Sequence, residues 1–343
     1  MNTRFLNFSV SFLVISLLVY VLYVGKHLLI PLVIALVFWY IIVRLTELYQ
    51  RIAIGQHHLP YGFALTCAIL STGIVLYLFS LLLTHSISNI IQEAPTYEKK
   101  LQDVLNFLDR ITDSRIKIDE LVSQINVTNL FSKLALILSN IASNFILILI
   151  YLLFLLLEHQ SFKKKLTKMC NTEAQLSHTN KIINKIISDI NGYLRVKVSI
   201  NAIAGVLSYI LLLAFGIDYA EFWGVLIFLL HFIPFIGPIV AIVFVLLAVS
   251  IQITSLLSFI FLAAILTAIQ FAIGNFLEPK WMGTRLNLSP IVILLSLAFW
   301  GAIWGIIGMF LCVPIMVVIS IILSKFPKTR PVAIMLSAEG NIE

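Results

Sequence analysis

The sequence predicts an all-α, polytopic integral membrane protein of about eight transmembrane helices, with broken or re-entrant helices in the C-terminal half. Hydrophobic residues make up 60% of the 343 residues and charged residues only 11%, against about 25% charged in an average soluble domain. Mean hydropathy is +1.04. Residues 198–277 carry only two formal charges, Asp218 and Glu221. A spanning helix needs about 20 mostly apolar residues, and a helix satisfies its own backbone hydrogen bonds in lipid.

Eight apolar stretches are predicted as spans of a single membrane permease domain, 1–343. They are residues 8–24, 28–43, 61–84, 134–157, 198–215, 222–249, 256–277 and 288–323. The first is expected to be an uncleaved span, because no small-residue cleavage site follows it. The second is short and carries Pro31, so we expect it to be tilted, re-entrant or frayed. The sixth and eighth are too long for one straight span and contain Pro and Gly, so broken helices are expected there.

The charges of the loops orient these spans. The loops 44–60 and 158–197 and the tail 325–330 are rich in Lys and Arg, whereas segment 86–133 is balanced, with six basic and seven acidic residues. Basic loops face the cytoplasm. We therefore expect a multi-pass protein of the inner (plasma) membrane with both termini cytoplasmic and 86–133 outside.

Two segments outside the membrane show helical periodicity. Segment 86–133 is predicted as an extracytoplasmic helical segment, and 158–197 as a cytoplasmic basic amphipathic segment. The inner segment suits a helix lying on the membrane surface, or packing against a neighbouring subunit or the protein's own underside. Its basic charge, and the net charge of +7, are explained by contact with membrane lipids, and no nucleic acid partner is expected.

The sequence shows no catalytic constellation, so we do not expect an enzyme. It contains no phosphate-binding loop, no nucleophile elbow and no histidine spacing suited to a metal. Its three cysteines are far apart, without C-x-x-C spacing. Neither a metal nor another cofactor is expected. The classes of protein that remain are a secondary transporter, a channel and a structural membrane protein.

The first interruption lies in 231–238, where Pro234 and Pro238 lack backbone donors and Gly237 permits unusual backbone geometry. Carbonyl groups freed in mid-membrane must face protein, water or a solute. The interruption therefore predicts either a piece of a solute path or a kink absorbed by helix packing.

The second interruption begins near Glu278, which with Lys280 and Arg285 supplies every charge between Glu221 and Lys325. These charges predict either an ion or proton relay or a polar loop at the membrane interface. The spacing of Gly301 and Gly305 predicts close helix packing, with gating as the alternative. Polar groups in the apolar spans predict interhelical hydrogen bonds or solute contacts. The candidates for the substrate path or its gating are Pro234, Gly237, Pro238, Gln270, Asn275, Glu278, Pro279, Lys280, Arg285, Pro290, Gly301, Gly305, Gly308 and Pro314.

Motifs across residues 190–320 resemble those of the autoinducer-2 exporter (AI-2E) family of membrane permeases. They are Gly192-Tyr-Leu-Arg-Val-Lys-Val198, Gly205, Gly216-Ile-Asp-Tyr-Ala, Gly224, Ile233-Pro-Phe-Ile-Gly-Pro238, Glu278-Pro-Lys-x-Met-Gly283, Leu288-Ser-Pro290 and Trp304-Gly-x-x-Gly308 followed by Pro314. Where that family often has Asn before Ile-Pro, this chain has His231-Phe232. The resemblance implies an eight-helix, homo-oligomeric carrier that exports a small molecule or, in some members, exchanges sodium for protons.

Three functions remain open from the sequence. The first is a secondary transporter that exports a small solute between the 234–238 break and the 278–290 loop. The second is a sodium/proton antiporter of the same fold, in which Glu278 titrates. The third is a non-transporting scaffold that holds partners through 86–133 and 158–197.

Overall fold

The computed structural model describes residues 3–51, 53–54, 57–82, 86, 144–170, 172–283 and 287–340. These residues are mostly helical, and five of their helices are long and apolar enough to cross a membrane. The predicted class, an all-α polytopic membrane protein with interrupted helices near its C-terminus, is confirmed. The outer segment 87–133 lies outside the described residues.

The chain divides into two compact units. The first takes residues from 1–76, 141–183 and 295–315, and the second takes residues from 77–140, 184–294 and 316–343. Most of the candidate path residues belong to the second unit, and those of 301–314 belong to the first.

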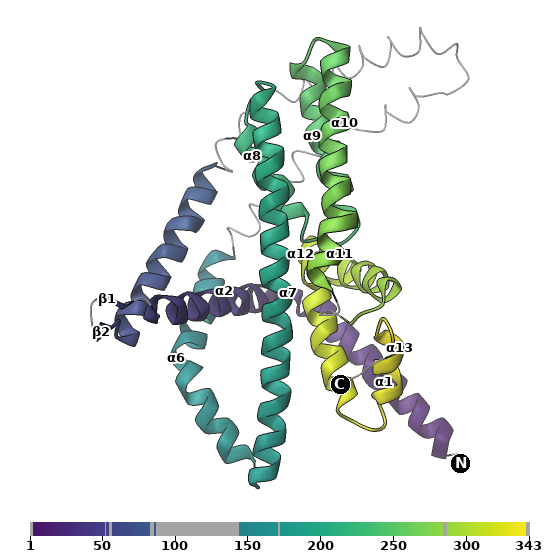
Figure 1. Cartoon of the computed structure of the whole chain (residues 1–343). Coiled ribbons are helices and arrows are strands. Elements are labelled where there is room, and N and C mark those ends of the chain that lie inside the picture. Colours follow the sequence, from purple (N-terminus) through teal and green to yellow (C-terminus); the bar gives the residue numbers. More distant parts are fainter. Residues whose placement is uncertain are drawn as a thin grey trace. The chain divides into compact units, whose positions relative to one another are not determined.

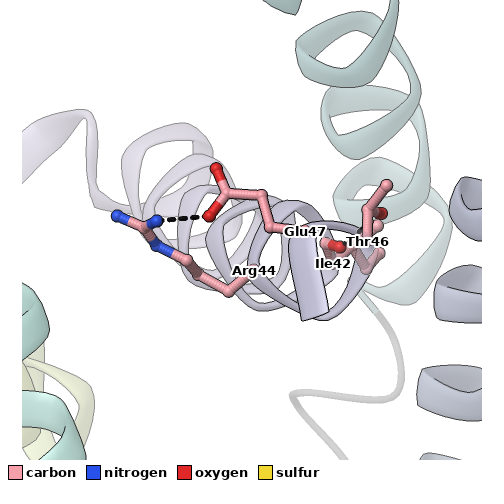
Figure 2. Close-up of polar contacts among 4 residues, drawn as sticks. All are labelled: Ile42, Arg44, Thr46 and Glu47. Carbon is pink, nitrogen blue, oxygen red and sulfur yellow. Dashed lines mark hydrogen bonds and ion pairs between the residues drawn. The ribbon is translucent and has the colours of Figure 1, made fainter. Parts of the chain in front are cut away.

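The first unit begins with helix α1 (Thr3–Val24), followed directly by α2 (Lys26–Gln50). The second predicted span is therefore a continuous helix of 25 residues, longer than expected. Near its end, Arg44 pairs with Glu47 at 2.5 Å and the buried Thr46 hydroxyl donates to the Ile42 carbonyl at 2.7 Å (Figure 2). These contacts, made within one helix, extend α2 past the apolar stretch that predicted it.

Short strands and two further helices complete this part of the chain. The strands β1 (Ala53–Ile54) and β2 (His57–His58) form one antiparallel pair. The apolar helix Tyr61–Leu82 follows them. Helix α6 (Phe145–Met169) packs against α2 in the first unit.

Helix α7 (Glu173–Ala214) contains two elements that were expected from the sequence to be separate. It is one rod of 42 residues (Figure 1), about 63 Å long at 1.5 Å per residue. The hydrocarbon core is only about 30 Å thick. The predicted amphipathic helix and the fifth span are therefore one continuous helix, whose N-terminal part lies outside the apolar stretch.

The sixth predicted span is a helical hairpin. Helix α8 (Ala220–Leu230) and helix α9 (Ile236–Gln252) contact each other and are joined by a turn at 231–235. The backbone N–H of Asp218, before α8, donates to Oε1 of Gln252, at the end of α9, at 2.6 Å. The two ends of the segment therefore meet.

Helices α10 (Leu256–Ala272), η1 (Ile273–Leu277) and α11 (Glu278–Met282) form one continuous rod beside α9 (Figure 1). The middle piece η1 is a π-helical turn. The core of the second unit includes fully buried side chains from four helices. They are Ile200 and Leu212 of α7, Trp223 and Ile227 of α8, Val245 and Val249 of α9, and Leu262 and Leu266 of α10.

The eighth predicted span, α12 (Pro290–Ser324), is also a hairpin. Gly305 leaves the helical conformation with φ 65° and ψ −144°. The Ser296 hydroxyl donates to the Cys312 carbonyl at 3.3 Å, although residues sixteen apart in a straight helix lie about 24 Å apart. The two arms, 290–304 and 306–324, therefore run back along each other. Helix α13 (Arg330–Leu336) ends the described chain, and its Leu336 carbonyl accepts from Ser289 N–H at 2.9 Å.

Candidate functional site

Helix α7 carries a row of buried polar side chains through the second unit. Lys197 is 2% exposed, and Asn201 and Ser208 are fully buried. Their spacings of four and seven residues place them on one face of the helix. Polar and charged groups at membrane depth are costly and usually functional. This row is therefore the first part of the candidate site.

Two side-chain contacts join this row to the rod of α10, η1 and α11. At one level, the Lys197 ammonium group donates to the carboxylate of Glu278. At the other, Gln270 Nε2 donates to the Ser208 hydroxyl at 2.9 Å. Along α7 the two levels are eleven residues apart, or about 16 Å.

Polar groups without partners lie in this part of the unit. Within the described residues, neither Asn201 Oδ1 nor Asn201 Nδ2 has a hydrogen-bond partner. Asn201 lies one turn from Lys197 toward Ser208, so it lies between the two levels. Buried polar atoms are normally paired. Two open atoms on one buried amide indicate a site for a ligand or for water.

The turn between α8 and α9 adds His231, which is 1% exposed. Its Nδ1 lies 3.0 Å from the Ile227 carbonyl oxygen. A carbonyl oxygen only accepts, so Nδ1 is the donor in this contact. The Gln270 side chain lies within hydrogen-bonding reach of the imidazole, and Lys197 lies close enough to interact with it.

The close approach of α7 and α8 depends on two glycines. A Cβ atom added to Gly205 would lie 2.7 Å from the Gly224 carbonyl oxygen, and one added to Gly224 would lie 2.8 Å from Tyr209 Cβ. Any larger residue would push the helices apart. The glycine pair therefore keeps the polar row of α7 close to the turn that carries His231.

The predicted break at 231–238 is the turn of the first hairpin. Phe235 has φ 61°, and a Cβ on Gly237 would collide with the Leu230 carbonyl oxygen, so this turn requires glycine there. The backbone N–H groups of Ile233 and Gly237 donate to carbonyls within the turn. Pro234 and Pro238 are half-buried beside them. The turn brings the His231 side chain to the buried polar side chains of α7 and α10.

The structure buries some of the candidate residues around Glu278 and exposes others. Lys280 and Pro279 are exposed, and Asn275 is exposed with its amide donating to the Phe271 carbonyl at 3.0 Å. Pro290 begins α12. Arg285 lies outside the described residues. The structure therefore places Glu278 and Gln270, of this predicted set, in the buried polar group.

The remaining candidates lie at the turn of α12, in the first unit. A Cβ on Gly308 would collide with the Trp300 carbonyl oxygen, and one on Gly301 would lie 2.8 Å from Met309 Cε. The predicted close packing at these glycines is thus between the two arms of one hairpin. Trp304 donates its indole N–H to the Leu22 carbonyl at 3.1 Å, which joins the turn to the end of α1. Pro314 lies half-buried in the second arm.

Sequence reasoning missed Lys197, Asn201 and Ser208. Lys197 ends the predicted basic loop and lies in the Gly192–Val198 motif, and neither position predicts that its side chain is buried. A signal was present, because polar residues recur at 197, 201 and 208 in a run that is otherwise largely apolar. His231 begins the predicted break at 231–238 and departs from the family's motif, but neither feature predicts a contact with Lys197 or Gln270.

The chemistry of the group suits binding and passage. The open amide of Asn201 supplies one acceptor and one donor, so it matches a solute that carries a hydroxyl or amine group. The ion pair between Lys197 and Glu278 adds no net charge to the site. Among the described residues, no group of three His, Cys, Asp or Glu side chains could hold a metal ion.

Comparison with known proteins gives a consistent result. The AI-2E family transporter profile matches residues 11–328. A putative transport protein of Haemophilus influenzae is 31% identical over 305 residues, covering 85% of each chain. The AI-2 transport protein TqsA of Escherichia coli is 31% identical over 286 residues, covering 80% of each chain. A putative transport protein of Borreliella burgdorferi is also 31% identical, over 74% of this chain and 70% of the relative.

Proposed function

This chain belongs to the AI-2E transporter family, and from that membership we propose that it is a secondary transporter that exports a small solute across the inner membrane. Its membership makes it a membrane transporter with several spanning helices. Export, a small hydroxyl-bearing solute, both termini in the cytoplasm and a homo-oligomeric state are the proposal. The E. coli relative is named an AI-2 transport protein, which makes AI-2 the first solute to test.

The observation that carries the proposal is the ion pair between Lys197 and Glu278. Lys197 is almost completely buried, and the Glu278 side chain is 25% exposed. A buried ion pair gives little net stability, because desolvation of both charges offsets their attraction. A stability role alone therefore explains this pair poorly, whereas a role in transport explains both the charges and the open polar atoms beside them.

Removing both charges together separates these two roles. In the double variant Lys197→Met/Glu278→Leu, no unpaired charge remains, so the protein should fold and reach the membrane. Efflux should fall to the level of cells that lack the protein. The control is Lys185→Gln/Asp189→Asn, which removes a more exposed pair on the same helix and should leave efflux unchanged.

The measurement compares AI-2 and untargeted metabolites inside and outside cells that produce each variant at equal membrane levels. Wild-type efflux by the double variant would show that the pair has no part in transport. The sodium/proton antiport alternative uses the same carboxylate and is tested in vesicles. If it is right, sodium-dependent proton movement occurs with the wild type and is lost in Glu278→Gln.

A further inference from the structure

The buried face of the rod that carries Glu278 changes its spacing at the π-helical turn. Leu262, Leu266, Gln270 and Ile273 are buried at steps of four, four and three residues, as expected for one face of an α-helix. After Ile273, the face continues at Glu278 and the buried Met282. The step from Ile273 to Glu278 is five residues, one more than an α-helix takes.

The π-helical turn Ile273–Leu277 supplies this extra residue. The backbone N–H of Glu278 donates to the carbonyl of Ile273, five residues earlier, which is the π-helical pattern. In an unbroken α-helix the buried face would continue from Ile273 to Leu277 and Trp281. Trp281 is instead 42% exposed. Without the extra residue, Leu277 would face Lys197.

Two neighbouring residues explain why the turn is wide here. Pro279 has no backbone N–H, and in an α-helix its ring would clash with the carbonyl of Asn275, four residues earlier. A wider turn relieves this clash. The Asn275 side chain donates to the Phe271 carbonyl at 3.0 Å, which satisfies an acceptor next to the altered hydrogen-bond ladder.

We infer that Pro279 is a positioning residue for transport: by holding the π-helical turn, it brings Glu278 rather than Leu277 to Lys197. Asn275 supports the same turn. Both side chains are exposed and act on the site through Glu278. This inference rests on the proposed transport function, since it gives a task to the ion pair on which that function depends.

The test replaces the proline and then restores the register. Pro279→Ala allows an α-helix, so the segment after the turn rotates by about 100° and efflux should be lost although Glu278 is unchanged. Deleting the exposed Phe276 in the Pro279→Ala background removes the extra residue and returns Glu278 to the buried face. This second variant should regain efflux. If Pro279 had a merely structural role, deleting Phe276 would not be expected to restore efflux to Pro279→Ala.

The register of the helix that carries Glu278 can also be measured by crosslinking, without a transport assay. In a background without Cys67, Cys170 and Cys312, Lys197→Cys is combined with either Glu278→Cys or Leu277→Cys. A short bifunctional thiol reagent is then applied, because a Lys–Glu pair spans a wider gap than a disulfide. With Pro279 present, the pair with Cys at 278 should react. With Pro279→Ala, reaction should move to the pair with Cys at 277.

The outcomes separate this inference from the proposed function. Normal efflux in Pro279→Ala, failure of the deletion to restore efflux, or crosslinking that stays at 278 without the proline would each overturn the inference. Normal efflux in Lys197→Met/Glu278→Leu would instead overturn the proposed site, whatever the crosslinks show. If the crosslink moves to 277 and the deletion restores efflux, Pro279 sets the register of the site.

Discussion

Asn201 is the residue whose burial is hardest to explain by stability. It is fully buried, and within the described chain neither polar atom of its amide has a partner. A buried polar group without a hydrogen bond costs about 1–3 kcal/mol. Retaining a residue that opposes folding is typical of functional sites, where stability and activity conflict.

Replacing Asn201 with leucine should therefore stabilise the protein and impair transport. The two side chains are similar in size, and leucine needs no hydrogen bond. We expect the thermal midpoint in detergent to rise by about 2–4 °C, while efflux falls. Asn275→Leu is the control, since that exposed amide already donates to the Phe271 carbonyl and its loss should bring no such rise. A lower midpoint for Asn201→Leu would mean that the amide is paired after all.

At this scale the sequence could single out Gln270 and Glu278, because each is polar inside a long apolar run. It could not show that Lys197 belongs with them. Lys197 follows a basic segment, and a lysine at such a boundary normally reaches back to the headgroups. Only the packing of α7 against the other helices determines that its ammonium group is buried beside Glu278.

Among the elements, α12 depends most on a single backbone conformation. Gly305 has φ 65° and ψ −144°, a region that is essentially restricted to glycine. An added Cβ there would meet no atom of the described residues within 4 Å. Any cost of a side chain at this position therefore comes from the backbone conformation itself.

Gly305→Ala should destabilise the protein by about 1–3 kcal/mol. The matched control is Gly73→Ala in helix Tyr61–Leu82, where an added Cβ would also meet no described atom within 4 Å. That position is helical, so alanine there should be neutral or slightly stabilising. Thermal unfolding in detergent measures both. Equal midpoints for the two variants would contradict the hairpin geometry at Gly305.

The interruptions of the sixth and eighth spans were predictable, but their shapes were not. Proline and glycine mark where a helix ends, because one lacks a donor and the other tolerates unusual φ values. They do not determine the angle at which the next helix leaves. Here that angle depends on contacts between residues far apart in sequence, such as Asp218 with Gln252 and Ser296 with Cys312.

For the whole molecule, the two hairpins preserve the predicted sidedness of the termini. Eight single crossings would put both termini on one side. A hairpin enters and leaves the membrane on the same side, so each hairpin removes one crossing. Two hairpins remove two crossings, and the number of crossings stays even. Two hairpins are therefore compatible with the predicted cytoplasmic placement of the basic tail 325–330 together with the loops 44–60 and 158–197, which is the placement that the distribution of positive charge predicts.

Labelling of single cysteines distinguishes this arrangement from eight separate crossings. In a background without the three native cysteines, Asp218→Cys and Thr254→Cys flank the first hairpin at exposed positions. A membrane-impermeant thiol reagent added outside intact cells should modify both, because the predicted orientation puts the two ends of the hairpin outside. Lys328→Cys should react only after the membrane is opened. If residues 218 and 254 react from opposite sides, then 222–249 crosses once, and the tail at 328 must then be outside or another segment must compensate.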